Sequence, residues 1–306
     1  MELSGVVAVL VFTGIFAGIY ALLSLGLNLQ WGFTGLFNIG IAGFYAIGAY
    51  TSALLTTPAP PNQVGGFGMP ILVGMLGSML TAGILAALIG RITLRLREDY
   101  LAIATIGLAE TLRLVLKNEE WLTNGVQGIR DIPRPLQHLF RESYDVYYLL
   151  LLAVSVVIVY LALERLVRSP WGRVLKAIRE DEDVAASFGK DVVRFKMQAL
   201  VLGAMIMGLG GSFYAHYVKY ISPDTFNPLM GTFIVWIMVM AGGSGNNRGA
   251  ITGAVVIWGL WSLSDFVTDL LPSPLDTRAS YIRVMLIGLV LQAILLKRPQ
   301  GLLPER

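Results

Sequence analysis

Long apolar runs separated by short polar breaks dominate the chain. From Leu3 to Gly90 there are 88 residues without one Asp, Glu, Lys, Arg or His. A helix needs about 20 predominantly apolar residues to cross the hydrocarbon core of a bilayer. Nine segments reach or approach that length: 4–29, 34–56, 69–90, 99–117, 146–164, 195–218, 229–243, 249–270 and 280–296. The pattern predicts an all-α, polytopic transmembrane helical bundle in which residues 1–306 form one domain, with nine spans and a range of eight to ten.

Composition supports this reading and excludes several others. Hydrophobic residues make up 55% of the chain and charged residues 14%, against roughly 25% charged in an ordinary soluble domain. The absence of cysteine excludes disulfides, thiolate metal sites and cysteine nucleophiles. Only two histidines occur, His138 and His216. We therefore expect no metal and no cofactor bound by this chain, and no nucleic acid as a partner.

The basic residues are distributed unevenly between the predicted loops. With nine alternating spans, the loops 91–98, 165–196 and 244–249 and the tail 297–306 share one side and carry 15 of the 23 Lys and Arg residues. Cytoplasmic loops are enriched in these residues. The asymmetry predicts a cytoplasmic C-terminus and an N-terminus on the outer side.

One loop, residues 169–196, is dense in both signs of charge. Ser169 and Pro170 predict a helix start with a capping hydroxyl and proline at the first helical position, and Gly189 predicts a left-handed helix end. We expect two short helices lying across the cytoplasmic face. The loop is either a solvated connection that obeys the charge asymmetry, or a docking element whose Val184, Ala185, Ala186 and Phe188 insert into a partner's groove.

Polar residues also interrupt the apolar segments. Asn28, Gln30, Asn38 and several glycines break the region around 32–40, which predicts either unwound backbone buried at membrane depth or a plain short loop. Glu110 and Arg113 lie three residues apart in the fourth segment. Charges inside a membrane are functional candidates, yet an i,i+3 structural pair is the favoured interpretation. The Gly14/Gly18 and Gly249/Gly253 spacings fit close helix packing.

Several motifs resemble permeases of ATP-binding-cassette (ABC) importers. The stretch "GRVLKAIREDEDVAASFG" (172–189) is similar to the cytoplasmic EAA-type loop of these permeases, especially those for branched-chain and other hydrophobic amino acids. The same family is indicated by "GLNLQWGFTGLFNIGIAGFYAIGAYTSALL" (26–55), "REDYLAIATIGLAETLRLVLKNEEWLTNGVQGI" (97–129) and the ending "KRPQGLLPER". These motifs span most of the chain and identify it as a member of the LivM-type family, whose fold is of the LivHM or ribose-permease-like type. Where relatives often carry a histidine, this chain has Phe37-Asn38-Ile39-Gly40-Ile41.

The resemblance implies an importer whose parts are divided among several chains. Its partners would be a second permease subunit of the LivH type, two cytoplasmic ATP-binding subunits that use ATP and Mg, and an extracytoplasmic solute-binding protein, in a bacterial or archaeal cytoplasmic (inner) membrane. The coupling residues would be Arg179, Glu180, Asp181, Glu182, Asp183, Val184, Ala185, Ala186, Phe188 and Gly189. Candidates for the translocation path are Asn28, Gln30, Phe37, Asn38, Glu110 and Arg113.

The sequence contains no nucleotide-binding loop of its own. A Walker A motif reads GxxxxGK[ST], and the only Gly-Lys pair, Gly189-Lys190, is followed by Asp191. We therefore expect a permease subunit rather than an enzyme, carrying hydrophobic or neutral amino acids. The alternatives are a related permease for urea or short amides, an ion-coupled secondary transporter, for which only Glu110 is a candidate carboxylate, and a membrane-embedded enzyme, for which no catalytic constellation is evident.

Overall fold

The computed structural model describes residues 3–58, 65–94, 98–137, 140, 143–268 and 279–305, and the described part is a bundle of helices without a β-sheet. The long helices are α1 (Leu3–Leu27), α2 (Ile41–Thr56), α3 (Ile71–Thr93), α4 (Glu98–Asn118), α6 (Tyr144–Arg168), α9 (Val192–Val218), α11 (Asn247–Thr268) and α12 (Ala279–Lys297). The shorter ones are η1 (Asn28–Gly32), α5 (Glu120–Thr123), η2 (Gly125–Gln127), α7 (Pro170–Glu180), α8 (Glu182–Ser187), η3 (Pro223–Phe226), η4 (Leu229–Phe233) and α10 (Ile234–Gly242).

Each of the nine apolar segments forms a helix, so the predicted helical membrane bundle is confirmed. Four helices are long and apolar enough to cross a membrane by length and composition: α1 continued by η1, α3, α6 and α9. The helix from Leu229 to Gly242 and the following α11 make a fifth candidate as a broken pair, bent by 119° at a short break. The count of nine spans therefore stays a prediction.

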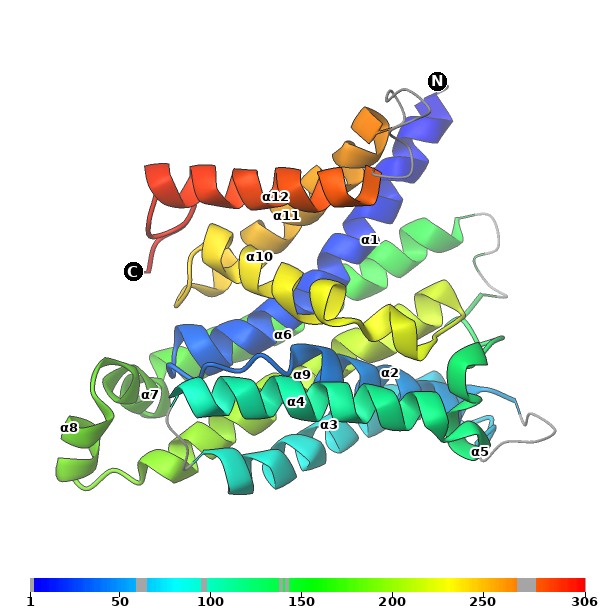
Figure 1. The fold of residues 1–306 in the computed structure, drawn as a ribbon. Helices are drawn as coiled ribbons and strands as arrows, with labels where there is room; N and C mark the ends of the chain where they lie inside the picture. The colour runs from blue at the N-terminus through cyan, green and yellow to red at the C-terminus, as the bar shows by residue number, and fades with distance from the viewer. Residues whose placement is uncertain are drawn as a thin grey trace.

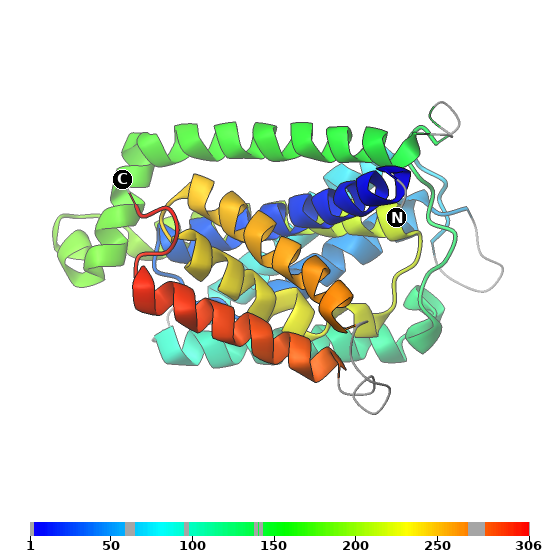
Figure 2. The ribbon, with the colours of Figure 1, turned by 90° about the horizontal axis from the view of Figure 1, so that it is seen from above.

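α1 runs through the middle of the bundle. Ile15, Ile19, Leu22, Leu23 and Leu25 have no exposed surface, as expected of a helix that is apolar all round. α6, α9, α10 and α11 pack around it, and Figure 2 shows α1 in blue between α6 and the α10–α11 pair. The predicted glycine spacings are used here: Gly14 and Gly18 lie against Leu149 and Leu152 of α6.

A second group, α2, α3 and α9, packs through small residues. Gly48 of α2 approaches Gly208 of α9 so closely that a Cβ on Gly48 would meet the backbone of Gly208, and a Cβ on Gly208 would meet the backbone of Ser78 in α3. Beside this contact, the Ser52 hydroxyl lies 2.7 Å from the Ser212 hydroxyl and 2.9 Å from the His216 Nε2 atom. Small residues let helix backbones approach in lipid, where apolar burial between helices gains little. Gly249 and Gly253 serve α10 and α11 in the same way.

We predict opposite effects of Gly48→Ala and Gly107→Ala on thermal stability. A methyl group on Gly48 overlaps backbone that has no room to move, and overpacking of this kind costs about 1–3 kcal/mol. Gly107 also lies in a helix, but a Cβ there meets nothing within 4 Å, so alanine raises stability by about 0.5–1 kcal/mol through helix propensity. The midpoints of thermal unfolding in detergent measure both. Equal shifts in the two variants would contradict the close α2–α9 packing.

Candidate functional site

One end of the bundle gathers the segments that carry most of the basic residues. α7, α8, the turn 243–246 and the tail 298–305 lie at this end, with the ends of α3 and α6, and α1 begins at the opposite end (Figures 1 and 2). We call it the basic end. The loops that the charge asymmetry assigned to one side of the membrane therefore do lie together.

The charged loop folds as the two short helices that the sequence predicted. α7 and α8 are separated by Asp181 alone, whose carboxylate accepts a hydrogen bond from the Val184 amide at 2.9 Å and so caps α8. Pro170 occupies the first turn of α7 as expected. The prediction that the Ser169 hydroxyl caps α7 is wrong. This hydroxyl donates to the Leu166 carbonyl at 2.6 Å, and α7 has no side-chain cap. Ser169 follows α6 so directly that a carbonyl of that helix is its nearest acceptor.

α8 presents an apolar tip to solvent. Phe188 is 78% exposed and Val184 is 50% exposed, and Ala186 is exposed as well. Ala185 differs, because it is 5% exposed and faces the chain itself. A groove of about 560 Å³ runs between α7 and α8 and is lined by Val174, Ala177 and Val184 among others. The set expected to insert into a partner therefore divides into three exposed residues and one that holds α8 in place.

The end of α8 closes as predicted from Gly189. This glycine has a φ of +75°, the left-handed conformation that favours residues without a Cβ. Its amide donates to the Ala186 carbonyl at 2.9 Å, and the Lys190 amide donates to the Ala185 carbonyl at 3.2 Å. The acidic residues Glu180, Asp181, Glu182 and Asp183 are exposed, and Glu182 pairs with Lys196 of α9.

The region 28–40 combines the π-helical turn η1 with unwound backbone and is mostly buried in the protein, which favours the first of the two interpretations of the sequence. After the π-helical turn η1, the chain has no regular helix from Phe33 to Gly40. Asn28, Gln30 and Asn38 are fully buried. Buried backbone groups need partners, since each one left unpaired costs on the order of 1–3 kcal/mol. The side chains of this segment and its neighbours supply them.

These hydrogen bonds connect the segment to five other parts of the chain. The Asn28 amide group donates to Asn247 at 3.1 Å and accepts from the Gly245 amide at 2.9 Å. Gln30 donates to the Leu200 carbonyl at 2.8 Å and accepts from Asn38 at 2.7 Å. Further bonds reach the segment from Thr105 of α4 and from Trp236 of α10. In this conformation, the three polar side chains bind the protein's own backbone and side chains.

Arg179 joins α7 to this segment and to the C-terminal tail. Its guanidinium donates to the Gly32 carbonyl and forms ion pairs with Glu180 at 2.9 Å and Glu305 at 2.8 Å. Lys176, one turn earlier on α7, binds the other oxygen of Glu305 at 2.7 Å. The sequence reasoning missed Lys176 and Glu305, although the charged ending of the "GLLPER" motif was a signal that the tail has an ionic partner.

The tail is also held by its backbone. The Leu302 and Leu303 amides donate to the carbonyls of Ala241 and Gly242 at 2.8 and 2.9 Å, at the end of α10. Asn246 donates to the Pro304 carbonyl at 3.0 Å. The tail, α7, the turn 243–246 and the unwound segment thus form one connected cluster, which we call the tail cluster.

Glu110 and Arg113 form the predicted i,i+3 pair, with 2.6 Å between the carboxylate and the Arg113 Nε atom. Arg113 and Lys117 also reach Asp224 of η3, at 3.1 and 3.5 Å, a partner that sequence spacing did not reveal. The pair is partly exposed, with 36% of the Glu110 side chain and 23% of the Arg113 side chain accessible.

Phe37 is half-buried and packs edge-on against Trp236, with ring centroids 4.9 Å apart.

We predict that Glu305→Gln loosens the tail while Glu120→Gln does not. The substitution removes the charge that Lys176 and Arg179 share, and such partly exposed ion pairs contribute about 1 kcal/mol or less each. Glu120 lies in α5 and has no ion pair among the described residues. A single cysteine at Gln300 in this cysteine-free chain reports tail mobility through a spin label. An immobile tail in Glu305→Gln would show that the backbone bonds suffice.

The spin label at position 300 also tests how the mobility of the tail depends on pH. Burial alone raises the pKa of the Glu305 carboxyl, but hydrogen bonds from Lys176 and Arg179 outweigh it and hold this pKa below the ordinary 4.5. A carboxyl with a lowered pKa in the folded state stabilises that state above its unfolded pKa. This stabilisation is lost as the pH falls through the folded pKa. We therefore expect an ordered tail from neutral pH down to 4.5 and release below it; release near pH 6 would contradict the ion pairs.

Comparisons with known proteins agree with the family indicated by the motifs. Residues 9–295 match the family described as "Branched-chain amino acid transport system / permease component". The high-affinity branched-chain amino acid transport system permease protein LivM of Salmonella typhimurium is 35% identical over 94% of this chain and 68% of its own length.

Two more distant relatives widen the range. The probable branched-chain amino acid transport permease protein LivM of Methanocaldococcus jannaschii is 27% identical over 94% of this chain and 91% of its own length. The guanosine ABC transporter permease protein NupQ of Bacillus subtilis is 24% identical over 78% of this chain and 76% of its own length. No solved structure matched the chain. The extent of the family match and the identity to LivM show that this chain belongs to the branched-chain amino acid transport permease family.

Proposed function

We propose that this chain is a membrane-spanning permease subunit of an ABC importer for branched-chain and other hydrophobic or neutral amino acids. The observation that carries the proposal is α8, a short helix with an apolar tip at the basic end, in a chain without a nucleotide-binding motif. A transporter that carried its own driving force would have no use for such an element. The ATPase activity resides in two cytoplasmic ATP-binding subunits, which use ATP and Mg, and this chain itself is not an enzyme.

α8 and its flanks are the surface on which an ATP-binding subunit docks. Phe188 and Val184 would insert into an apolar groove of that subunit, because a 78% exposed phenylalanine at a short helix end gains the most by burial against a partner. Asp181 and Gly189 fix the two ends of the helix, and Ala185 holds it against the chain. Glu180, Glu182, Asp183 and Ala186 line the rim of the contact.

Arg179 connects the docking surface to the rest of the permease. It lies three residues before the start of α8 and binds both the Gly32 carbonyl and the tail. Movement of α8 upon nucleotide binding would therefore be passed directly to the backbone at Gly32. This is the kind of rigid connection through which closure of one subunit shifts another.

For the translocation path we propose the surface formed by Phe37, Glu110 and Arg113. These side chains are partly exposed and belong to the unwound segment and to α4, and the path would be completed by a second permease subunit of the LivH type. Asn28, Gln30 and Asn38 act from behind this surface, because their hydrogen bonds hold the backbone that carries Phe37. An extracytoplasmic binding protein delivers the solute at the end opposite to the basic end.

We also propose a location and a substrate for the protein. The basic end, with the C-terminus, faces the cytoplasm of a bacterial or archaeal cell whose cytoplasmic (inner) membrane holds the protein. The family name and the LivM relatives favour branched-chain amino acids. The alternatives are urea or short amides, and less favourably an ion-coupled carrier. NupQ, named for guanosine, makes a nucleoside a further competitor to include in the tests.

We predict that Phe188→Ala weakens the association with ATP-binding subunits, whereas Phe67→Ala does not. Truncation of a buried interface aromatic costs on the order of 2 kcal/mol or more, which is about 30-fold in affinity. Phe67 is 60% exposed in the segment between α2 and α3 and has the same chemistry. Quantitative co-purification with candidate ATP-binding subunits measures the difference. If both variants retained the ATP-binding subunits equally, α8 would be part of a solvated loop and not a docking element.

We also predict ATP-dependent uptake of leucine, isoleucine or valine by the complete complex in proteoliposomes. Uptake should need the binding protein and continue when ion gradients are collapsed by ionophores. Unlabelled urea, acetamide and guanosine serve as competitors at equal concentration. Inhibition by one of these in preference to leucine would move the substrate to that class, and uptake that follows an ion gradient without ATP would establish the secondary carrier.

A further inference from the structure

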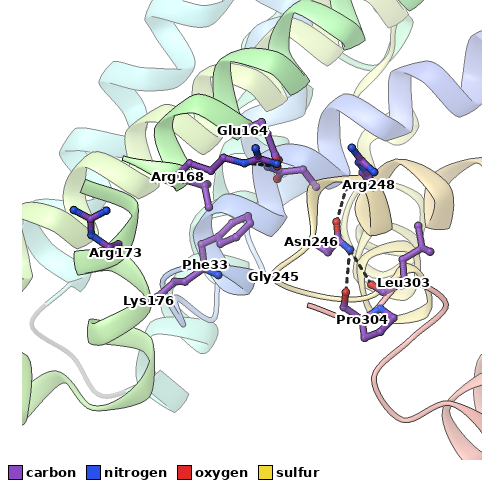
Figure 3. Close-up of a pocket in the computed structure, with 12 residues that line it drawn as sticks. Phe33, Glu164, Arg168, Arg173, Lys176, Gly245, Asn246, Arg248, Leu303 and Pro304 are labelled. Atoms are coloured by element: carbon purple, nitrogen blue, oxygen red, sulfur yellow. Dashed lines mark hydrogen bonds and ion pairs between the residues drawn. The ribbon is translucent and has the colours of Figure 1, made fainter. Parts of the chain in front are cut away.

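A cavity of about 570 Å³ opens at the basic end beside the tail cluster. It lies between the end of α6, α7, the start of α11 and the tail residues Leu303 and Pro304 (Figure 3). Four basic side chains line it together with a single carboxylate: Arg168, Arg173, Lys176, Arg248 and Glu164. Such an excess of positive charge around a hollow favours an anionic occupant.

Acidic residues neutralise only part of this charge. Glu164 is already engaged by Arg168 at 2.6 Å and by the Asn247 amide group at 3.2 Å. Lys176 is engaged by Glu305. Among the described residues, Arg173 has no ion pair, and Arg248 donates its Nε–H to the Tyr160 hydroxyl at 3.0 Å and is attracted by Glu164 without a direct ion pair. Figure 3 shows these two arginines on opposite sides of the hollow.

Exposed apolar side chains continue from the cavity along α6 and α11, and we call the space between these two helices the furrow. α6 and α11 both pack against α1 but make little contact with each other. Tyr160 and Glu164 of α6 meet α11 at its start, and on the same side of α6 follow Val157 and Leu161, each 52% exposed. Residues three, four and seven positions apart share one face of a helix.

α11 supplies the other wall of this furrow. Val255, seven positions after Arg248, is 52% exposed, and a Cβ on Gly259, four positions further on, would meet nothing within 4 Å. The space beside α11 is therefore open. A charged cavity that continues into an apolar furrow fits a molecule with an anionic head and a hydrocarbon tail.

We propose that this cavity binds the headgroup of an anionic phospholipid, with an acyl chain in the furrow between α6 and α11. The shared chemistry is a phosphate diester on the Arg248 side of the cavity, near the positive end of the α11 dipole at Asn247, while Arg173 attracts the headgroup from the opposite side. Basic pockets between helices at the cytoplasmic side are suited to such headgroups. A lipid there would fill the gap between α6 and α11 and would contact the tail cluster where Leu303 and Pro304 line the cavity.

The furrow favours a lipid over the other anions that could occupy the cavity. A free phosphate needs the cavity alone and gains nothing from exposed valines and leucines. An acidic surface of an ATP-binding subunit would reach Arg173, which also borders the α7–α8 groove, but would leave the furrow uncovered. Only an amphiphile uses both features at once.

The test measures lipid binding to the full-length chain in detergent by native mass spectrometry and by the midpoint of thermal unfolding. Phosphatidylglycerol should bind and raise the midpoint, while phosphatidylcholine and inorganic phosphate at the same concentration should not. Arg248→Gln and Arg173→Gln should each weaken phosphatidylglycerol binding by about fivefold, from the loss of one basic contact at a lipid surface. Arg194→Gln, an exposed arginine at the same end, is the matched control.

A second variant tests the furrow separately. Gly259→Leu places a side chain in open space without strain. It should weaken the binding of phosphatidylglycerol while leaving the basic cavity unchanged. Equal binding in the arginine variants and the control would overturn the site, as would protection by inorganic phosphate as strong as that by the lipid. Loss of all bound lipid from the cavity when ATP-binding subunits are added would assign Arg173 and Arg248 to that protein contact instead.

Discussion

The hydrogen bonds of the buried, unwound segment after α1 tie together most of the helices that surround it. A membrane offers no water to a broken helix, so each free amide and carbonyl must find a partner inside the protein. The Gly40 amide donates to Asn38, the Ile39 amide donates to Thr105, and the Gly32 carbonyl accepts from Arg179. Asn28 and Gln30 extend this network to Asn247 and to the Leu200 carbonyl. The positions of α4, α9, α10 and α11 follow, since each contributes an atom to this network.

The same need for partners explains why the basic end is organised as it is. The turn 243–246 approaches Asn28, the tail lies on the end of α10, and α7 reaches over both through Arg179 and Lys176. Glycines at Gly32, Gly243 and Gly301 permit these approaches, because a Cβ at any of them would collide with a neighbouring segment. A partner bound to α8, as proposed above, would consequently be linked to the buried backbone of Gly32 through one arginine.

Much of this arrangement was predictable, and the failures have definite causes. Apolar runs located every long helix, and Pro170 and Gly189 marked the start of α7 and the end of α8, because those signals depend on local backbone chemistry. The contacts of Glu305 and Asp224 were not predictable, since they join residues far apart in sequence. The Ser169 hydroxyl was assigned to the wrong helix because two helices compete for it. Periodicity alone also does not say whether the interruption at 33–40 is exposed or buried; only packing decides that.

Under the proposed function, energy enters this permease through α8. Because the chain has no cysteine, Phe188→Cys and the matched Phe67→Cys can each carry a single photoreactive maleimide in the assembled importer. We expect the label at position 188 to cross-link to an ATP-binding subunit, with a yield that changes between the nucleotide-free and ATP-bound states, and the label at position 67 not to do so. Cross-linking from position 67 to that subunit, or none from position 188, would show that energy enters the permease elsewhere.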